Sequence, residues 1–136
     1  MPLPLLDLNH IALATRWPEE SERFYCDVLG FTRLERPPFS FRGSWLRGPG
    51  VTLHLIENQT LEPATTGEIS SRHNHLAFSV ASVDPVKQEL AARDIAFREQ
   101  VNAGGARQVF FRDPDGNYLE VAVYPIPTGQ ERPAAS

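Results

Sequence analysis

Four residues with metal-binding side chains interrupt β-favouring stretches of this sequence: His10, His54, His75 and Glu120. Side chains alternate across a strand, so residues two positions apart share a face. Counting in twos places each of the four among smaller residues, opposite the large apolar side chains that would pack on a core. The sequence therefore predicts that all four lie on one accessible face of a sheet.

A shared metal ion is the interpretation that accounts for all four residues. An unsatisfied buried polar group costs about 1–3 kcal/mol, so four of them in a sheet need a common partner. Imidazole and carboxylate together suit a divalent ion of Zn, Ni, Fe, Mn or Co. Each residue taken alone is more often an ordinary surface or core residue. His73 faces the same side as His75 and is the alternative ligand.

An internal repeat relates these residues to one another. Residues 9–15 resemble residues 74–80 at an offset of 65, and residues 50–56 resemble residues 116–122 at an offset of 66. All four segments alternate as half-buried strands do. The repeat aligns His75, rather than His73, with His10, and it places the four residues on the first and last strands of two halves.

The remaining elements position these strands. An amphipathic helix is predicted at residues 18–29, ended by Gly30, and a second at residues 85–93, preceded by Asp84. Turn signals separate three further strands in each half, so the order is βαβββ twice and the predicted fold class is α+β. The predicted parts are a module at 5–57, a linker at 58–72, a module at 73–124 and a frayed polar tail at 125–136.

Composition and charge exclude several classes of partner. The chain has 136 residues, 41% of them hydrophobic and 22% charged, which is typical of one packed domain. A net charge of −4 without a basic cluster argues against nucleic acid. No segment has the length of a membrane span or the pattern of a signal sequence, and the single cysteine, Cys26, favours a cytoplasmic location.

Four longer stretches carry a family resemblance: residues 8–13, 24–31, 74–80 and 109–120. Together they resemble the vicinal oxygen chelate superfamily, which includes glyoxalase I, extradiol dioxygenases and bleomycin resistance proteins. The resemblance implies an eight-stranded, cup-shaped sheet with a divalent metal on its concave face, held by His10, His54, His75 and Glu120. It also implies a homodimer, in which two modules pair within one chain or exchange between two chains.

The function implied is that of a metal-dependent lyase or isomerase. Such an enzyme chelates two neighbouring oxygens of a small oxygenated metabolite and stabilises the enediolate or oxyanion that forms when a proton leaves. Glu120 would be both ligand and proton shuttle, and His54 is the second candidate for the base. Glyoxalase I carries a carboxylate where this chain has His54. Two alternatives stay open: an iron-dependent dioxygenase using His10, His75 and Glu120, and a non-catalytic binding or resistance protein.

Substrate contacts are predicted on the central strands of each half. Arg42 and Trp45 lie on one such strand, and Arg107 and Gln108 lie on its counterpart. Strand parity puts the members of each pair on opposite faces, so at most half of them line the cup. An arginine there would suit an anionic substrate, although an exposed arginine without a ligand is commoner. The candidates are Arg42, Trp45 and Gln108.

Overall fold

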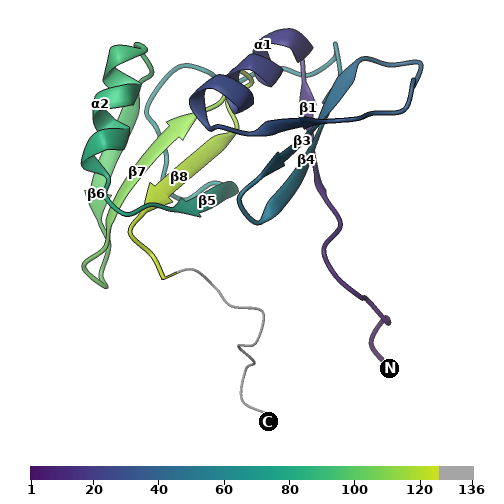
Figure 1. Ribbon diagram of the computed structural model, residues 1–136. Helices are drawn as coiled ribbons and strands as arrows, with labels where there is room; N and C mark the ends of the chain where they lie inside the picture. The colour runs from purple at the N-terminus through teal and green to yellow at the C-terminus, as the bar shows by residue number, and fades with distance from the viewer. Residues whose placement is uncertain (126–136) are drawn as a thin grey trace. The chain divides into compact units, whose positions relative to one another are not determined.

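The computed structural model describes residues 1–125, and the chain divides into two compact units (Figure 1). The first unit contains Met1–Thr66 together with the turn Asp113–Gly116, and the second contains Gly67–Arg112 and the residues from Asn117 onward. The turn was expected within the second module but packs in the first unit. The predicted tail at 125–136 lies outside the described residues, apart from Pro125.

The first unit is a four-stranded sheet with a helix packed on β3 and β4. Its elements are β1 (Ile11–Thr15), α1 (Pro18–Arg23), a π-helical turn η1 (Phe24–Val28), β2 (Thr32–Leu34), β3 (Gly43–Gly48) and β4 (Val51–Glu57). The strand order is β1-β4-β3-β2, with β1 parallel to β4 and the other neighbours antiparallel. The last strand of the unit therefore lies beside the first.

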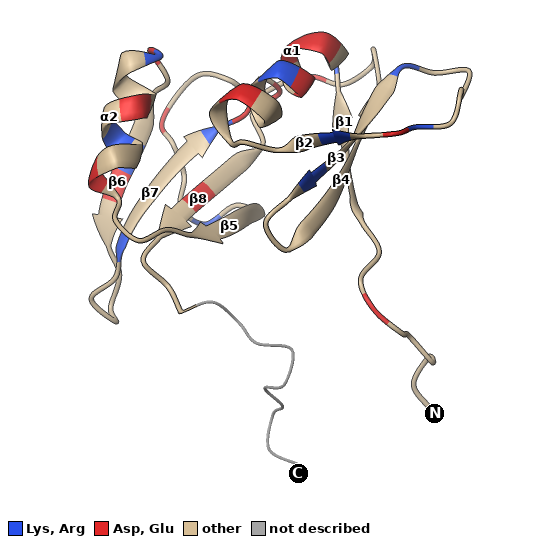
Figure 2. Ribbon diagram, in the orientation of Figure 1, with Lys and Arg blue, Asp and Glu red and all other residues tan. Residues whose placement is uncertain are grey.

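The second unit repeats this topology. Its elements are β5 (His75–Ser79), α2 (Asp84–Ala92), β6 (Phe97–Val101), β7 (Arg107–Arg112) and β8 (Tyr118–Ala122). The strand order is β5-β8-β7-β6, with β5 parallel to β8. Figure 2 shows acidic and basic residues interspersed along α2, and one of them, Lys87, pairs with Glu99 of β6 at 2.6 Å. The predicted α+β class and the twofold βαβββ order are confirmed.

Some element boundaries differ from the prediction. The predicted helix at 18–29 ends at Val28, and its second half winds as the π turn η1 rather than as an α-helix. Gly30, with φ of +77°, then reverses the chain. His10 and Arg42 were expected within strands, but each lies one residue before its strand begins, at Ile11 and Gly43. None of the helices within residues 1–125 is long and apolar enough to cross a membrane.

Burial confirms the predicted faces of the first sheet. Leu53 and Leu55 of β4 are 0% and 1% exposed, whereas His54 between them is only half-buried. Leu46 of β3 and Tyr25 of η1 are fully buried as well. The large apolar side chains therefore form the core beneath the helix, and His54 lies on the other side of the sheet.

The turn Asp113–Gly116 brings two buried carboxylates into the first unit. The hydroxyl of Tyr25 donates to Asp113 at 2.7 Å. Asp115 accepts from the hydroxyl of Ser21 at 3.0 Å and from the backbone N–H of Arg16 at 2.8 Å. Hydrogen bonds to a charged group contribute about 1.5–3 kcal/mol each. These carboxylates therefore fasten the helical segment and the end of β1 to the turn.

Gly116 allows the turn to approach closely. Its φ is +89°, a conformation that side chains disfavour, and a Cβ atom there would collide with the backbone of Ala64. The glycine thus meets two requirements at once, the chain reversal and the contact with residue 64.

We expect Tyr25→Phe to lower the free energy of unfolding by about 2 kcal/mol at neutral pH, because buried Asp113 loses a donor. Urea denaturation followed by circular dichroism measures this, with Tyr118→Phe as a control that should stay near wild type. Burial first, and then Asp113, raise the pKa of Tyr25 well above its usual value. The difference in the free energy of unfolding between the wild type and Tyr25→Phe is therefore largest below about pH 10 and decreases as the pH rises further. A difference that stays constant through strongly alkaline pH would contradict this role.

Candidate functional site

The second unit brings together two of the four predicted metal ligands. The Oε1 atom of Glu120 lies 3.1 Å from Nε2 of His75. This follows from the parallel pairing of β5 with β8, which places Ala77 opposite Glu120 and His75 opposite Tyr118. Glu120 is the one acidic residue on β8 (Figure 2). A carboxylate and an imidazole nitrogen thus face each other on one side of the sheet.

A backbone contact fixes the orientation of His75. Its Nδ1 atom lies 2.7 Å from the carbonyl oxygen of His73. Because a carbonyl oxygen only accepts, Nδ1 must carry a proton, and Nε2 is the atom presented to Glu120. Metal-binding histidines commonly hold their second nitrogen in this way. The ring of His73 itself lies against Tyr118, with centroids 5.2 Å apart.

Glu120 is buried rather than accessible, which corrects the expectation of an open face. Its exposed fraction is 3%. Gln108 donates through Nε2 to Glu120 at 3.3 Å and to the hydroxyl of Tyr124 at 2.7 Å. Gln100 in turn donates to the amide oxygen of Gln108 at 2.9 Å. The structure therefore places Gln108, a predicted substrate contact, where it positions the carboxylate of Glu120.

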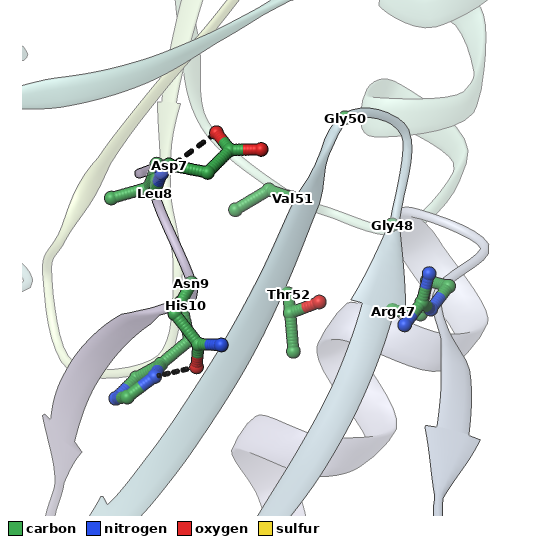
Figure 3. A pocket seen from close by; sticks show the side chains of 9 residues that line it. All are labelled: Asp7, Leu8, Asn9, His10, Arg47, Gly48, Gly50, Val51 and Thr52. Atoms are coloured by element: carbon green, nitrogen blue, oxygen red, sulfur yellow. Dashed lines mark hydrogen bonds between the residues drawn. The ribbon is translucent and has the colours of Figure 1, made fainter. Parts of the chain in front are cut away.

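In the first unit, His10 is exposed and lines a pocket of about 290 Å³ beside the β3–β4 turn (Figure 3). Its Nδ1 atom lies 2.8 Å from the amide oxygen of Asn9, an acceptor, so Nδ1 is the protonated nitrogen of this contact. His10 thus directs Nδ1 to an oxygen acceptor, as His75 does toward the carbonyl of His73.

His54 is held between two other rings. Its imidazole stacks on His10 with ring centroids 3.8 Å apart and on Trp45 with centroids 4.3 Å apart, at interplanar angles of 16° and 2°. Trp45 is the direct cross-strand neighbour of His54. Burial, with smaller effects of His10 and Arg36, lowers the pKa of His54. The ring is therefore neutral at pH 7 and able to bind a metal ion or accept a proton.

Arg42 is not brought together with Trp45. Its guanidinium pairs with Glu57 at 2.6 Å and with Glu19 of α1 at 2.5 Å, on the helix side of the sheet. Both carboxylates compensate its charge, so Arg42 links the β2–β3 connection to α1 and to β4. Trp45 lies on the opposite side, against His54.

The four predicted ligands are therefore assembled as two pairs, one in each unit. Among residues 1–125, no group of three or more His, Cys, Asp or Glu side chains is close enough to hold a metal ion by itself. The chemistry of the donors nevertheless fits a divalent ion: His10 and His75 each present Nε2, His54 is neutral, and Glu120 is a buried carboxylate. Two ligands about 2.1 Å from one ion are roughly 3.0–3.4 Å apart, and the His75–Glu120 distance falls within this range.

Sequence reasoning missed the residues that orient the ligands. Asn9, Gln100 and Tyr124 were not identified, although the Asn-His pair at 9–10 recurs at 74–75 and could have drawn attention to Asn9. The hydrogen bond from Gln100 follows from its register opposite Gln108 on β7. No sequence signal indicated the contact with Tyr124, which lies beyond the last strand.

These features define a class: an α+β protein of two βαβββ repeats, each with a polar pair at the start of its first strand and on its last strand. The chain belongs to the Glyoxalase/Bleomycin resistance protein/Dioxygenase superfamily, whose sequence model matches residues 7–121. The resemblance inferred from the sequence is thereby confirmed.

Three similar proteins illustrate the range of the family. The chain is 38% identical to "Glyoxylase I 4" of Arabidopsis thaliana over 127 residues, covering 88% of this chain and 72% of that protein. A lactoylglutathione lyase from Agrobacterium tumefaciens has a TM-score of 0.66 at 26% identity, covering 88% of this chain and 95% of the other. A glyoxalase/dioxygenase from Nostoc punctiforme has a TM-score of 0.73 at 27% identity, with 93% and 97% covered. These relatives support a glyoxalase-type role.

We expect Trp45→Leu to raise the pKa of His54 towards about 6.5, because the substitution uncovers one face of a ring whose pKa is lowered chiefly by burial. Trp45→Phe keeps an aromatic neighbour and should leave the pKa low. An NMR titration of the histidine ring protons in metal-free protein measures both. An unchanged pKa in Trp45→Leu would show that Trp45 does not shield His54.

Proposed function

We propose that this protein is a metal-dependent enzyme of the glyoxalase type, a lyase or isomerase of a small oxygenated metabolite. His10, His54, His75 and Glu120 would hold the divalent ion. The observation that carries the proposal is the matched orientation of His10 and His75. Each donates its Nδ1 proton to an oxygen acceptor and directs Nε2 away from that acceptor, at equivalent positions of the repeat.

A divalent ion bound there would polarise two neighbouring oxygens of the substrate and so acidify the adjacent C–H bond. Glu120 is suited to accept that proton because it is buried and has one oxygen, Oε1, facing His75. Gln108 holds the other oxygen, Oε2, so the carboxylate keeps its direction. His54 is the alternative base, since its lowered pKa leaves it unprotonated at neutral pH.

A homodimer and a cytoplasmic location are part of the proposal. The leucines that precede β1 are strongly exposed, at 78% for Leu3, 84% for Leu5 and 68% for Leu8, and a second protomer would cover such apolar surface. Cys26 is a free thiol, as is usual in a reducing compartment. Sedimentation velocity measures the oligomeric state directly.

We expect protein purified without an affinity tag to bind about one divalent ion per chain, as measured by elemental analysis. His75→Ala and Glu120→Ala should each weaken metal binding by more than about 100-fold, since even partners outside the ligand shell contribute about 10–100-fold. His73→Ala is the matched control and should bind normally. Protein that takes up none of Zn, Ni, Fe, Mn or Co on titration would contradict the proposal.

We expect the metal-loaded protein to act on lactoylglutathione, the compound named by its Agrobacterium relative. Glu120→Gln should lose nearly all of this activity, because an amide cannot accept the proton. Oxygen consumption by ferrous protein with a catechol would instead identify the dioxygenase chemistry. Binding that is stoichiometric and insensitive to chelators would identify a sequestering protein.

A further inference from the structure

The loop between β2 and β3 carries an aromatic cluster that the proposed chemistry does not use. The rings of Phe39 and Phe41 lie nearly parallel, with centroids 5.2 Å apart, and the residues are 44% and 42% exposed. Neither ring is needed to fill the core, which the leucines of β3 and β4 provide. The loop thus displays apolar surface at the end of the sheet.

Arg36 is held against both rings. Its guanidinium carbon lies 4.9 Å from the ring centroid of Phe39 and 5.2 Å from that of Phe41. One Nη2 proton is donated to the carbonyl oxygen of Phe41 at 2.8 Å. The cation–π contacts and the hydrogen bond together orient the planar guanidinium. Its remaining N–H groups are left for another acceptor.

The charge of Arg36 is not compensated. Within residues 1–125, no carboxylate lies within ion-pair distance of it, whereas its neighbour Arg33 pairs with Glu22 at 3.2 Å and Arg42 pairs with Glu19 and Glu57. An arginine held in place without a carboxylate is an arrangement suited to an incoming anion.

Arg36 and the two rings line a pocket of about 370 Å³ between this loop and α1. The acidic residues in the pocket, Glu19 and Glu22, are already paired with arginines. The unpaired charge that remains in the pocket is therefore positive. Its walls combine one cation with aromatic rings.

The cluster is connected to the imidazole stack of the candidate site. The ring of Phe39 lies 6.1 Å from that of Trp45, and Trp45 stacks on His54 at 4.3 Å. Arg36 also contributes to the lowered pKa of His54, so its charge is felt at the imidazole. The pocket itself is lined by α1 and by Arg42 and Ser44 on the helix side of the sheet, whereas Trp45 and His54 lie on the other side, so a ligand in the pocket would be separate from the candidate metal ligands.

We propose that this pocket is a recognition subsite for a monoanionic ligand that carries a carboxylate next to an aromatic or bulky apolar group. Arg36 donates its free N–H groups to the carboxylate, and Phe39 and Phe41 contact the apolar group. The subsite goes beyond the proposed function, because the pocket and His54 lie on opposite sides of the sheet. The paired acids Glu19 and Glu22 disfavour ligands with several negative charges, such as nucleotides.

Isothermal titration calorimetry with 3-phenyllactate, an aromatic α-hydroxy acid, tests the subsite in metal-free, full-length protein. We expect Arg36→Gln to weaken binding by about 10-fold or more, and Arg36→Lys, which keeps the charge, to weaken it less. Replacing both Phe39 and Phe41 with Ser should abolish the preference for phenyllactate over lactate. The uncharged amide of phenyllactate should bind the wild type as weakly as the acid binds Arg36→Gln.

Arg23→Gln is the matched control, because it removes an exposed arginine of α1 that lies outside the pocket. It should bind phenyllactate as the wild type does. Equal binding by Arg36→Gln and the wild type, equal losses in the Arg36 and Arg23 variants, or equal affinity for acid and amide would each overturn the proposal. Thermal melting of each variant separates lost recognition from lost folding.

The two proposals fail independently in these experiments. A protein that binds phenyllactate through Arg36 but takes up no divalent ion would refute the metal-dependent function and keep the subsite. A protein that binds one ion per chain but shows no dependence on Arg36 would refute the subsite alone.

Discussion

The parallel pairing of the first and last strands in each repeat is the constraint on which the candidate site depends. The pairing sets Ala12 opposite His54 in one unit and Ala77 opposite Glu120 in the other. A polar residue placed two positions before each alanine then meets the partner strand's polar residue from the same side. One register, used twice, thus produces both the stacked imidazoles and the imidazole–carboxylate pair. A slip by one residue would turn all of these side chains to the core.

Much of this arrangement could be predicted from the sequence because it depends on periodicity. Alternation in twos assigned His54 to one face and Leu53 and Leu55 to the other, and the burial of β4 agrees. The offset of about 65 residues identified the two βαβββ units. Proline and glycine signals located α2, and the helical segment formed by α1 and η1, to within a residue. These are local properties, and each is carried by several consecutive residues. That four side chains hold one metal ion stays a prediction.

The features of the site that could not be predicted depend on contacts between residues far apart in the chain. A single sequence carries no signal for such contacts. Glu120 is buried because Gln108 and Tyr124 cover it, and Arg42 is withdrawn from the site because two carboxylates compete for it. The alternation of side chains along a strand shows that Arg42 and Trp45 face opposite sides of the sheet. It does not show which arginine keeps an unpaired charge. The difference between Arg42 and Arg36 is decided by where Glu19 and Glu57 happen to lie. The π turn η1 also lacked a signal, since its residues suit an α-helix equally well.

The turn Asp113–Gly116 has a consequence for the origin of the repeat. The corresponding turn of the first half, Gly48–Gly50, contains no carboxylate, and Tyr25, Ser21 and Arg16 instead donate to a segment that lies 88 to 99 residues later in the chain. A fragment that ended at residue 66 would leave the fully buried hydroxyl of Tyr25 without its acceptor, Asp113. A half-length ancestor with the same helix would have had to borrow the turn from another molecule. Fusion of two gene copies would have made that borrowed turn a permanent part of one chain.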